Sequence, residues 1–332
     1  MQGSLLRDGD REDSKGGHKM LRRYQLAEGR LAETTDEMSP VLVYINPDEA
    51  ERRFLINTLR LDEHTLSSAL DPDELSRLEF EPDHIAVVFK RPKYYSGEDN
   101  FLFKVASTGA FLFKDRLVVV LSEDAPMFDG KCFLKQHTVA DVFLKIVYRS
   151  IFHFLEHLKV INLVSDRLEQ KINSAMENRY LLSLFALEKS LVYYLNAINS
   201  NGVLIEKLKA NSGKVGLSPE EIEFLDDMMI ENSQCYRLAE IYSNILASLM
   251  DARASIVGNN LNVLIKRLTI LSVVFMPLNI IAGIGGMSEF SMMTQGIDWR
   301  LSYTLFSVAL VGIGFVTYLI LRNFGLEKPP KE

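Results

Sequence analysis

Apolar residues are distributed very unevenly along this chain of 332 residues, and they concentrate near its C-terminal end. Residues 268–287 and 301–321 contain no charged side chain. Each run reaches the roughly 20 residues that a helix needs to cross a hydrocarbon core about 30 Å thick. A buried helix of a soluble domain is usually shorter and has a polar face. The pattern therefore predicts two transmembrane helices, an external loop at 288–300 and a tail at 322–332.

The region before these helices has a mixed pattern that predicts an α/β domain over residues 41–130. Alternating or continuous apolar runs predict strands at 41–45, 77–81, 84–90, 101–107, 110–114 and 117–122. Helical stretches are expected near 48–58 and 63–70. Residues 1–40 are polar and charged and lack an apolar core segment, so we expect them to be disordered and not to form a secretory signal.

From residue 131 to 217 the pattern is helical, with long helices expected at roughly 138–174 and 179–211. A strong start signal follows, with Ser218 as N-cap, Pro219 at the first helical position and Glu221 three residues after the cap. No credible stop occurs before the glycines at 283–286. One helix is therefore predicted over 218–287, with its membrane part at 268–287 and a length on the order of 100 Å. Its apolar positions alternate in steps of four and three, which predicts symmetric self-association: Leu238, Tyr242, Ile245, Leu249, Ala252 and Ile256.

The charges indicate how the chain crosses the membrane and which partners it excludes. Basic residues precede the first apolar run and follow the second: Lys266, Arg267, Arg322, Lys328 and Lys331. The loop between the runs has mixed charges, with Glu289, Asp298 and Arg300. By the positive-inside rule this predicts that both termini lie in the cytoplasm. The net charge of the chain is −7. An acidic cytoplasmic region argues against nucleic acid as a partner and is suited to cations. Only two cysteines are present, Cys132 and Cys235, and they are far apart in sequence, so neither a disulfide framework nor a cysteine metal site is expected.

One face of the first apolar run is polar or small. Its members are spaced by seven, three, four, three, four and three residues: Asn262, Thr269, Ser272, Met276, Asn279, Gly283 and Gly286. Because lipid disfavours an amide such as Asn279, this face should meet protein or water. It fits either contact between helices or the lining of a pore. A pore of neutral oxygens could pass Mg²⁺ with its waters still bound, and Glu289 and Asp298 would then lie at the mouth or simply be solvated.

Around this face the sequence closely resembles the CorA magnesium transporters. The match consists of Ser255-Ile-Val257-Gly-Asn259-Asn-Leu-Asn262, Lys266, Leu268-Thr269, Phe275-Met-Pro277-Leu278, Ile281-Ala282-Gly283 and Gly286-Met287. The resemblance implies an α+β cytoplasmic domain followed by long helices, a very long stalk helix continuous with the first membrane helix, a second membrane helix, and a homopentameric funnel. The implied function is transport of Mg²⁺, with Zn²⁺, Co²⁺ or Ni²⁺ as alternatives, across a bacterial inner (plasma) membrane. Divalent cations are then the substrate and a regulator, and no other cofactor is expected.

The resemblance also implies roles for individual residues. The pore would be lined by Asn262, Ile265, Leu268, Thr269, Ser272, Met276, Asn279 and Gly283. The selecting loop would consist of Gly286, Met287, Ser288 and Glu289. Asp251 matches a stalk carboxylate that binds a regulatory cation in relatives gated by magnesium, and Asp99 is the candidate for its acidic partner.

The sequence departs from the family at three places. Gly286-Met287-Ser288 stands where the family has Gly-Met-Asn, Gly285 stands where an aromatic residue is usual and makes the loop more flexible, and the basic cluster after the second membrane helix is thin. These departures leave the selected ion open. They motivate an alternative, a membrane protein derived from this family that conducts without selectivity, or does not conduct, and acts in sensing or regulation.

The hypothesis that the chain is an enzyme is supported by one motif. His153-Phe-Leu-Glu156-His157 spells H-x-x-E-H, the pattern of the inverted zincin peptidases, and Glu169 is a candidate third ligand. The apolar residues around the motif are typical of packing. We therefore expect no enzyme and assign no catalytic residue.

Overall fold

A computed structural model describes residues 20–27, 29–93, 102–129, 133, 138–174 and 178–323. The chain divides into two compact units, Met1–Leu249 and Met250–Glu332, and each is described by itself. Asp99 and the tail from residue 324 lie outside the described residues.

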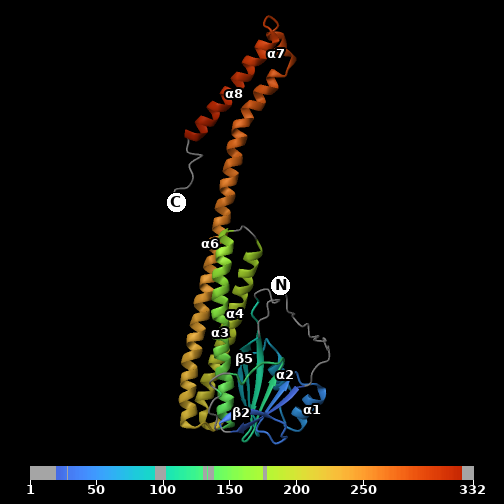
Figure 1. The fold of residues 1–332 in the computed structure, drawn as a ribbon, viewed down its shortest axis with the longest axis vertical. Helices are drawn as coiled ribbons and strands as arrows, with labels where there is room; N and C mark the ends of the chain where they lie inside the picture. Colours follow the sequence, from blue (N-terminus) through green and yellow to red (C-terminus); the bar gives the residue numbers. More distant parts are fainter. Residues whose placement is uncertain are drawn as a thin grey trace, which may run out of the picture. The chain divides into compact units, whose positions relative to one another are not determined.

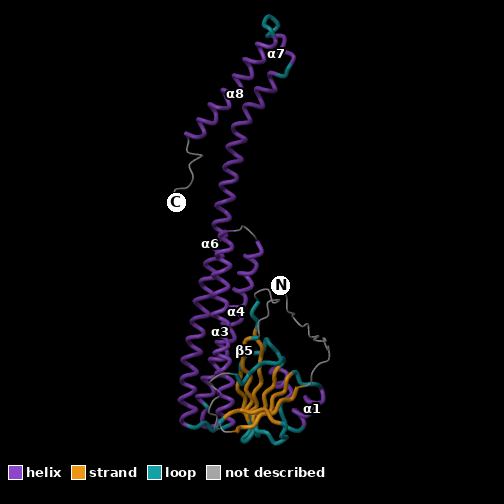
Figure 2. Tube along the Cα trace, in the orientation of Figure 1, coloured by secondary structure: helices purple, strands orange, loops and turns teal. Residues whose placement is uncertain are grey.

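The first unit contains a seven-stranded sheet with the order β2-β1-β3-β7-β6-β5-β4. The strands are β1 (Met20–Ala27), β2 (Arg30–Thr34), β3 (Val41–Ile45), β4 (Arg77–Phe80), β5 (Ile85–Pro92), β6 (Val105–Leu112) and β7 (Leu117–Leu121). β3 and β7 pair in parallel, and every other pair is antiparallel. Figure 2 shows these strands gathered in one sheet beside the long helices of the same unit.

Both faces of this sheet are covered, which explains why β3 and β7 are apolar at every position. Val41, Val43 and Ile45 belong to the core beneath the long helices α3 (Val139–Ser174) and α4 (Asn178–Ala210). Leu42 and Tyr44 belong to a separate core beneath α1 (Glu49–Asn57) and α2 (Glu63–Leu70). Because successive side chains of a strand point to opposite faces, a strand covered on both sides needs no polar positions. Figure 1 shows α1 and α2 on one side of the strands and α3 on the other.

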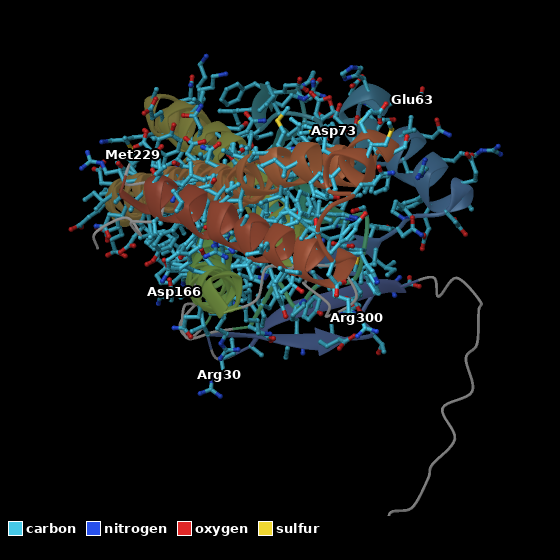
Figure 3. The ribbon with its side chains drawn as sticks, turned by 90° about the horizontal axis from the view of Figure 1, so that it is seen from above. Arg30, Glu63, Asp73, Asp166, Met229 and Arg300 are labelled. Atoms are coloured by element: carbon cyan, nitrogen blue, oxygen red, sulfur yellow. The ribbon has the colours of Figure 1, made fainter. Side chains whose placement is uncertain are left out.

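The prediction that residues 1–40 are disordered is wrong for Met20–Ala27 and Arg30–Thr34, because these residues form the β1–β2 hairpin at the edge of the sheet. The turn uses Gly29 at φ 72°, a conformation that glycine adopts without strain. Tyr24 packs on Phe128 with 4.6 Å between ring centroids. Arg30 projects from the sheet (Figure 3). The polar residues of this hairpin do not alternate with apolar ones, since Arg22 and Arg23 are adjacent and so are Glu33 and Thr34. The sequence therefore lacks the period of two that marks a strand. Residues 1–19 lie outside the described residues.

The prediction of two strands at 101–107 and 110–114 is also wrong, since β6 continues through Gly109. A Cβ on Gly109 would lie 2.5 Å from Cβ of Ala69 in α2 and 3.0 Å from Cε2 of Phe111. The glycine therefore lets α2 approach the strand closely, and it does not make a turn.

The predicted start of the long helix is confirmed. α6 runs from Pro219 to Gly285, 67 residues, beginning in the first unit and ending in the second. The Ser218 backbone N–H donates to Glu221 Oε2 (2.7 Å), and the Glu221 N–H donates to Ser218 Oγ (3.3 Å). This reciprocal pair is a capping box. Just before it, the short helix α5 (Ser212–Val215) ends at Gly216, with φ 78°.

Three described helices are long and apolar enough to cross a membrane by length and composition, within Tyr180–Ala210, Pro219–Gly285 and Trp299–Leu321. The first of these lies in α4, where the sequence predicts no span. Its most apolar stretch is 39% buried within the chain, against 6% for each of the others. Buried polar groups of α4 bind the sheet region: Ser190 Oγ accepts from the Phe103 N–H (2.9 Å), and Ser200 Oγ accepts from the Ser76 N–H (2.7 Å). α4 is therefore apolar because it packs in the α/β unit.

The second unit contains the end of α6, the short helix α7 (Ser288–Met293) and the helix α8 (Trp299–Asn323). α8 returns alongside α6 (Figure 1). A Cβ on Gly314 of α8 would lie 3.1 Å from Cδ1 of Leu278 in α6. The two apolar runs thus form a helical hairpin, and small residues bring its helices into close contact.

Candidate functional site

The candidate site is the polar face of α6 in the second unit. In the single chain, every residue predicted to line the pore is exposed: Asn262, Ile265, Leu268, Thr269, Ser272, Met276, Asn279 and Gly283. The Thr269 hydroxyl donates to the Ile265 carbonyl and the Ser272 hydroxyl to the Leu268 carbonyl, both at 2.9 Å. These hydroxyls satisfy their own donors within the helix and leave oxygen lone pairs available to a ligand.

The helix α8 packs on the other side of α6. At about 100° per residue, Leu278 and Gly285 lie about 160° and 180° around α6 from Met276. Both residues contact α8, Leu278 at Gly314 and Gly285 at Phe306. A Cβ on Gly283, on the polar face, would meet nothing within 4 Å among the described residues. The polar face therefore does not serve as the contact between the two helices of the hairpin.

The predicted selecting loop follows α6 directly. The Gly286 N–H donates to the Ala282 and Gly283 carbonyls at 3.1 and 3.2 Å, which extends the helical bonding by one residue. Met287 is the N-cap of α7, and the Ser288 hydroxyl donates to Glu289 Oε2 at 3.4 Å. Ser288 and Glu289 are both exposed. The structure thus brings a hydroxyl and a carboxylate together at the end of the polar face.

Asp298, the other predicted acidic residue of the mouth, has a structural partner. Its Oδ1 accepts from the Arg300 N–H (3.0 Å), and its carbonyl accepts from Leu301 and Ser302 (3.0 Å each). These bonds satisfy free N–H groups at the start of α8, as an N-terminal cap does. A solvated capping role accounts for Asp298 without an ion.

Asp251, the predicted regulatory ligand, is exposed on α6. Among the described residues, no group of three or more His, Cys, Asp or Glu side chains is placed to hold a metal ion. Within the described part of the chain, Asp251 therefore does not belong to a cluster of this kind.

The H-x-x-E-H motif lies in α3 and packs inside the first unit. The rings of His153 and His157 are 4.5 Å apart, and His157 Nδ1 lies 2.6 Å from the Tyr194 hydroxyl of α4. Burial lowers the pKa of His153 to about 3, helped by His157, Arg149 and Arg91, and burial lowers the pKa of His157 to about 4.

Glu156 points elsewhere, into an ion pair with Arg149 at 3.2 Å. The cavity beside His153 is about 30 Å³, room for water rather than a peptide. The motif is therefore part of the packing between α3 and α4.

Comparison with known proteins identifies the family. The family profile described as "CorA-like Mg2+ transporter protein" matches residues 42–323. The chain belongs to this family. Its members are membrane transporters rather than enzymes, in agreement with the sequence prediction. The CorA-like match covers the α/β domain, the long helices and both membrane runs.

Individual relatives agree with this assignment. The "Cobalt/magnesium transport protein CorA" of Methanocaldococcus jannaschii is 22% identical over 288 residues, covering 84% of this chain and 88% of the relative. The solved complete structure of the CorA magnesium transporter from the same organism aligns with a TM-score of 0.72 at 19% identity, covering 91% of this chain and 96% of the other. The full-length CmaX protein aligns with a TM-score of 0.67 at 13% identity, covering 93% and 99%. At these identities the structural likeness shows the fold alone.

Sequence reasoning missed one part of the site. The sequence predicts loop flexibility at Gly285, whereas the structure buries this residue under the ring of Phe306 from α8. Phe306 lies in an apolar run, where nothing in the pattern distinguishes it from its neighbours. The pairing of these two residues depends on how α6 and α8 pack against each other, and no local signal carries that information.

Proposed function

We propose that this CorA-like chain is one subunit of a homopentameric channel that conducts divalent cations through a pore lined by the polar face of α6. The supporting observation is that this face is exposed along its whole length and lies opposite the contact with α8. Asn279 would be costly in contact with lipid. Symmetric copies of α6 around a water-filled axis would give each polar side chain both protein and water.

The chemistry of this face suits a hydrated cation. Its ligands would be amide, hydroxyl and backbone carbonyl oxygens, and its membrane part has no carboxylate. Mg²⁺ gives up its waters reluctantly, so rings of neutral oxygens can bind those waters without trapping the ion. Mg²⁺ is the first candidate, with Zn²⁺, Co²⁺ or Ni²⁺ as alternatives. The relative named as a cobalt/magnesium transport protein supports Mg²⁺ and Co²⁺ among these ions.

The proposed orientation puts both termini in the cytoplasm of a bacterial cell, with Ser288 and Glu289 at the outer mouth. Lys266 and Arg267 precede the first apolar run, which favours the inner side by the positive-inside rule. Asp251 would then lie on the cytoplasmic part of α6, where a cation shared between neighbouring subunits could regulate the pore.

The test is metal uptake into liposomes by the Asn279→Leu variant. A ring of leucines in place of amides would favour dewetting of the pore, so uptake of Mg²⁺ and Co²⁺ should be lost while the oligomer stays intact on size-exclusion chromatography. The matched control is Asn260→Leu, which makes the same change on α6. Asn260 lies about 160° around the helix from Asn262 of the polar face.

The control should conduct like the wild-type protein. Equal flux through wild-type and Asn279→Leu proteins would mean that Asn279 only joins helices and that ions pass elsewhere. Loss of flux in both variants would mean that the leucines act through general damage to α6.

A further inference from the structure

The outer end of the α6–α8 hairpin is built around one glycine. A Cβ on Gly285 would lie 2.3, 2.7 and 2.9 Å from three ring carbons of Phe306. Real Cβ atoms essentially never approach this closely, so no other residue fits at position 285 while the ring keeps its place. The ring of Phe306 therefore packs directly on the backbone of Gly285, the last residue of α6.

The same ring also contacts the segment that follows α6. Phe306 and Phe290 of α7 have centroids 5.1 Å apart, with the rings tilted by 57°. Phe290 in turn meets Tyr303 edge-on at 5.9 Å. Tyr303 and Phe306 are three residues apart on α8, so both project from one face of that helix. Phe290 is thus held against α8 by two rings.

These contacts lie immediately before and after the predicted selecting loop. Gly286, Met287, Ser288 and Glu289 are the residues between Gly285 and Phe290. The residues on either side of this segment, Gly285 and Phe290, both contact Phe306, which fixes where the segment begins and where it ends. A short segment anchored at both ends has few backbone conformations open to it.

We propose that Phe306, which packs on Gly285 and against Phe290, is a positioning residue. It determines where Ser288 and Glu289 lie at the outer mouth. It does not touch the ion. The inference rests on the proposed channel function, and it adds a residue that acts through the loop.

Helix pairing itself has a separate anchor, so changing Phe306 need not separate the hairpin. Gly314 contacts Leu278 about two turns further along α8. Gly312, two residues before Gly314, would meet nothing within 4 Å in the described chain if it carried a Cβ. The variant Gly312→Ala is therefore a matched control for a glycine substitution in the same hairpin.

The experiment compares Gly285→Ala, Phe306→Leu, their combination and Gly312→Ala in the full-length protein in liposomes. The readout is the ratio of Mg²⁺ to Co²⁺ uptake. Each of the first two variants should shift this ratio by about tenfold, the equivalent of about 1.4 kcal/mol. The double variant should return toward wild type, because leucine leaves room for the added methyl group, and Gly312→Ala should not change the ratio. An unchanged ratio with uniformly lower flux in both single variants, or independent effects in the double variant, would overturn the proposal.

A second readout does not depend on conduction. In a background carrying Cys132→Ala and Cys235→Ala, the thiol introduced by Ser288→Cys is titrated with a membrane-impermeant reagent. Gly285→Ala should change its rate of modification about tenfold, Phe306→Leu should reverse that change, and Gly312→Ala should have no effect. If the protein conducts no ion but these rates still respond, the proposed function fails and the positioning role stands. If the rates do not respond, the positioning role fails whatever the flux.

Discussion

Asn201 offers the sharpest test of how α4 is held in the α/β unit. Its side chain is fully buried and makes three bonds to the sheet region. Oδ1 accepts from the Lys90 N–H and from the Ser76 hydroxyl, and Nδ2 donates to the Lys90 carbonyl, each at 2.8 Å. The amide thus pairs with both backbone groups of one residue in β5, in the way a neighbouring strand would.

Substitution by alanine leaves these three partners without bonds in a buried place. An unsatisfied buried polar group costs about 1–3 kcal/mol. The Ser76 hydroxyl can rotate, so the two backbone groups of Lys90 carry most of the penalty. We expect Asn201→Ala to lower local stability by about 3–5 kcal/mol, a large part of the 5–15 kcal/mol that usually stabilises a domain.

The assay is native-state amide hydrogen exchange on the full-length protein in detergent, followed in peptides that cover β5. The control is Asn199→Ala, which removes the same side chain from an exposed position two residues away and should change stability by no more than about 0.5 kcal/mol. A loss below about 1 kcal/mol in Asn201→Ala would refute the reasoning. It would also reopen the assignment of α4, since a membrane-spanning α4 could not bond to β5.

Three further predictions concern the same unit, and thermal unfolding in detergent checks each of them. Gly109→Ala should destabilise it by about 1–3 kcal/mol, because the new methyl group would collide with Ala69. Ser218→Ala should cost about 0.5–2 kcal/mol, through loss of the α6 cap, and an unchanged melting temperature would contradict this. The pKa values of His153 and His157, lowered by burial to about 3 and about 4, lie below the ordinary value of 6.5. Below about pH 6.5 the unfolded chain therefore binds more protons than the folded chain. The stability that the neutral pair contributes is complete above that pH and is lost progressively as the pH falls toward the folded-state pKa values of about 4 and about 3. At pH 5.5 it is already reduced by about 3 kcal/mol. The double variant His153→Gln, His157→Gln should lose this dependence of stability on pH.

The elements with strong local signals could be predicted from the sequence. The capping box at Ser218 and the two uncharged runs define α6 and α8 because caps and membrane spans depend on a few neighbouring residues. The β1–β2 hairpin could not be predicted, since adjacent polar residues at 22–23 and 33–34 break the alternation that marks a strand. Gly109 could not be interpreted because its role depends on α2, 40 residues earlier in the sequence.

The candidate site could also be predicted from the sequence only in part. Its polar face follows from helical spacing alone, so the residues from Asn262 to Gly283 can be grouped on one side of the helix by their positions in the sequence. Which side of α6 meets α8 depends on packing between the helices, and the contacts of Leu278 and Gly285 decide it. Those contacts separate the polar face from the hairpin interface and thereby favour a face reserved for other copies of the chain.

The most direct test of the central claim is uptake of divalent cations by the purified protein in liposomes, measured with separate dyes for Mg²⁺, Co²⁺ and Zn²⁺. The Ser288→Asn variant is measured alongside. We predict uptake of Mg²⁺ by the wild-type protein, with a change in the ratio among the ions when Ser288 becomes asparagine. No uptake of any of these ions by either protein, with the oligomers intact, would contradict the account. The polar face of α6 would then join subunits in a sensing or regulatory assembly that conducts none of these ions.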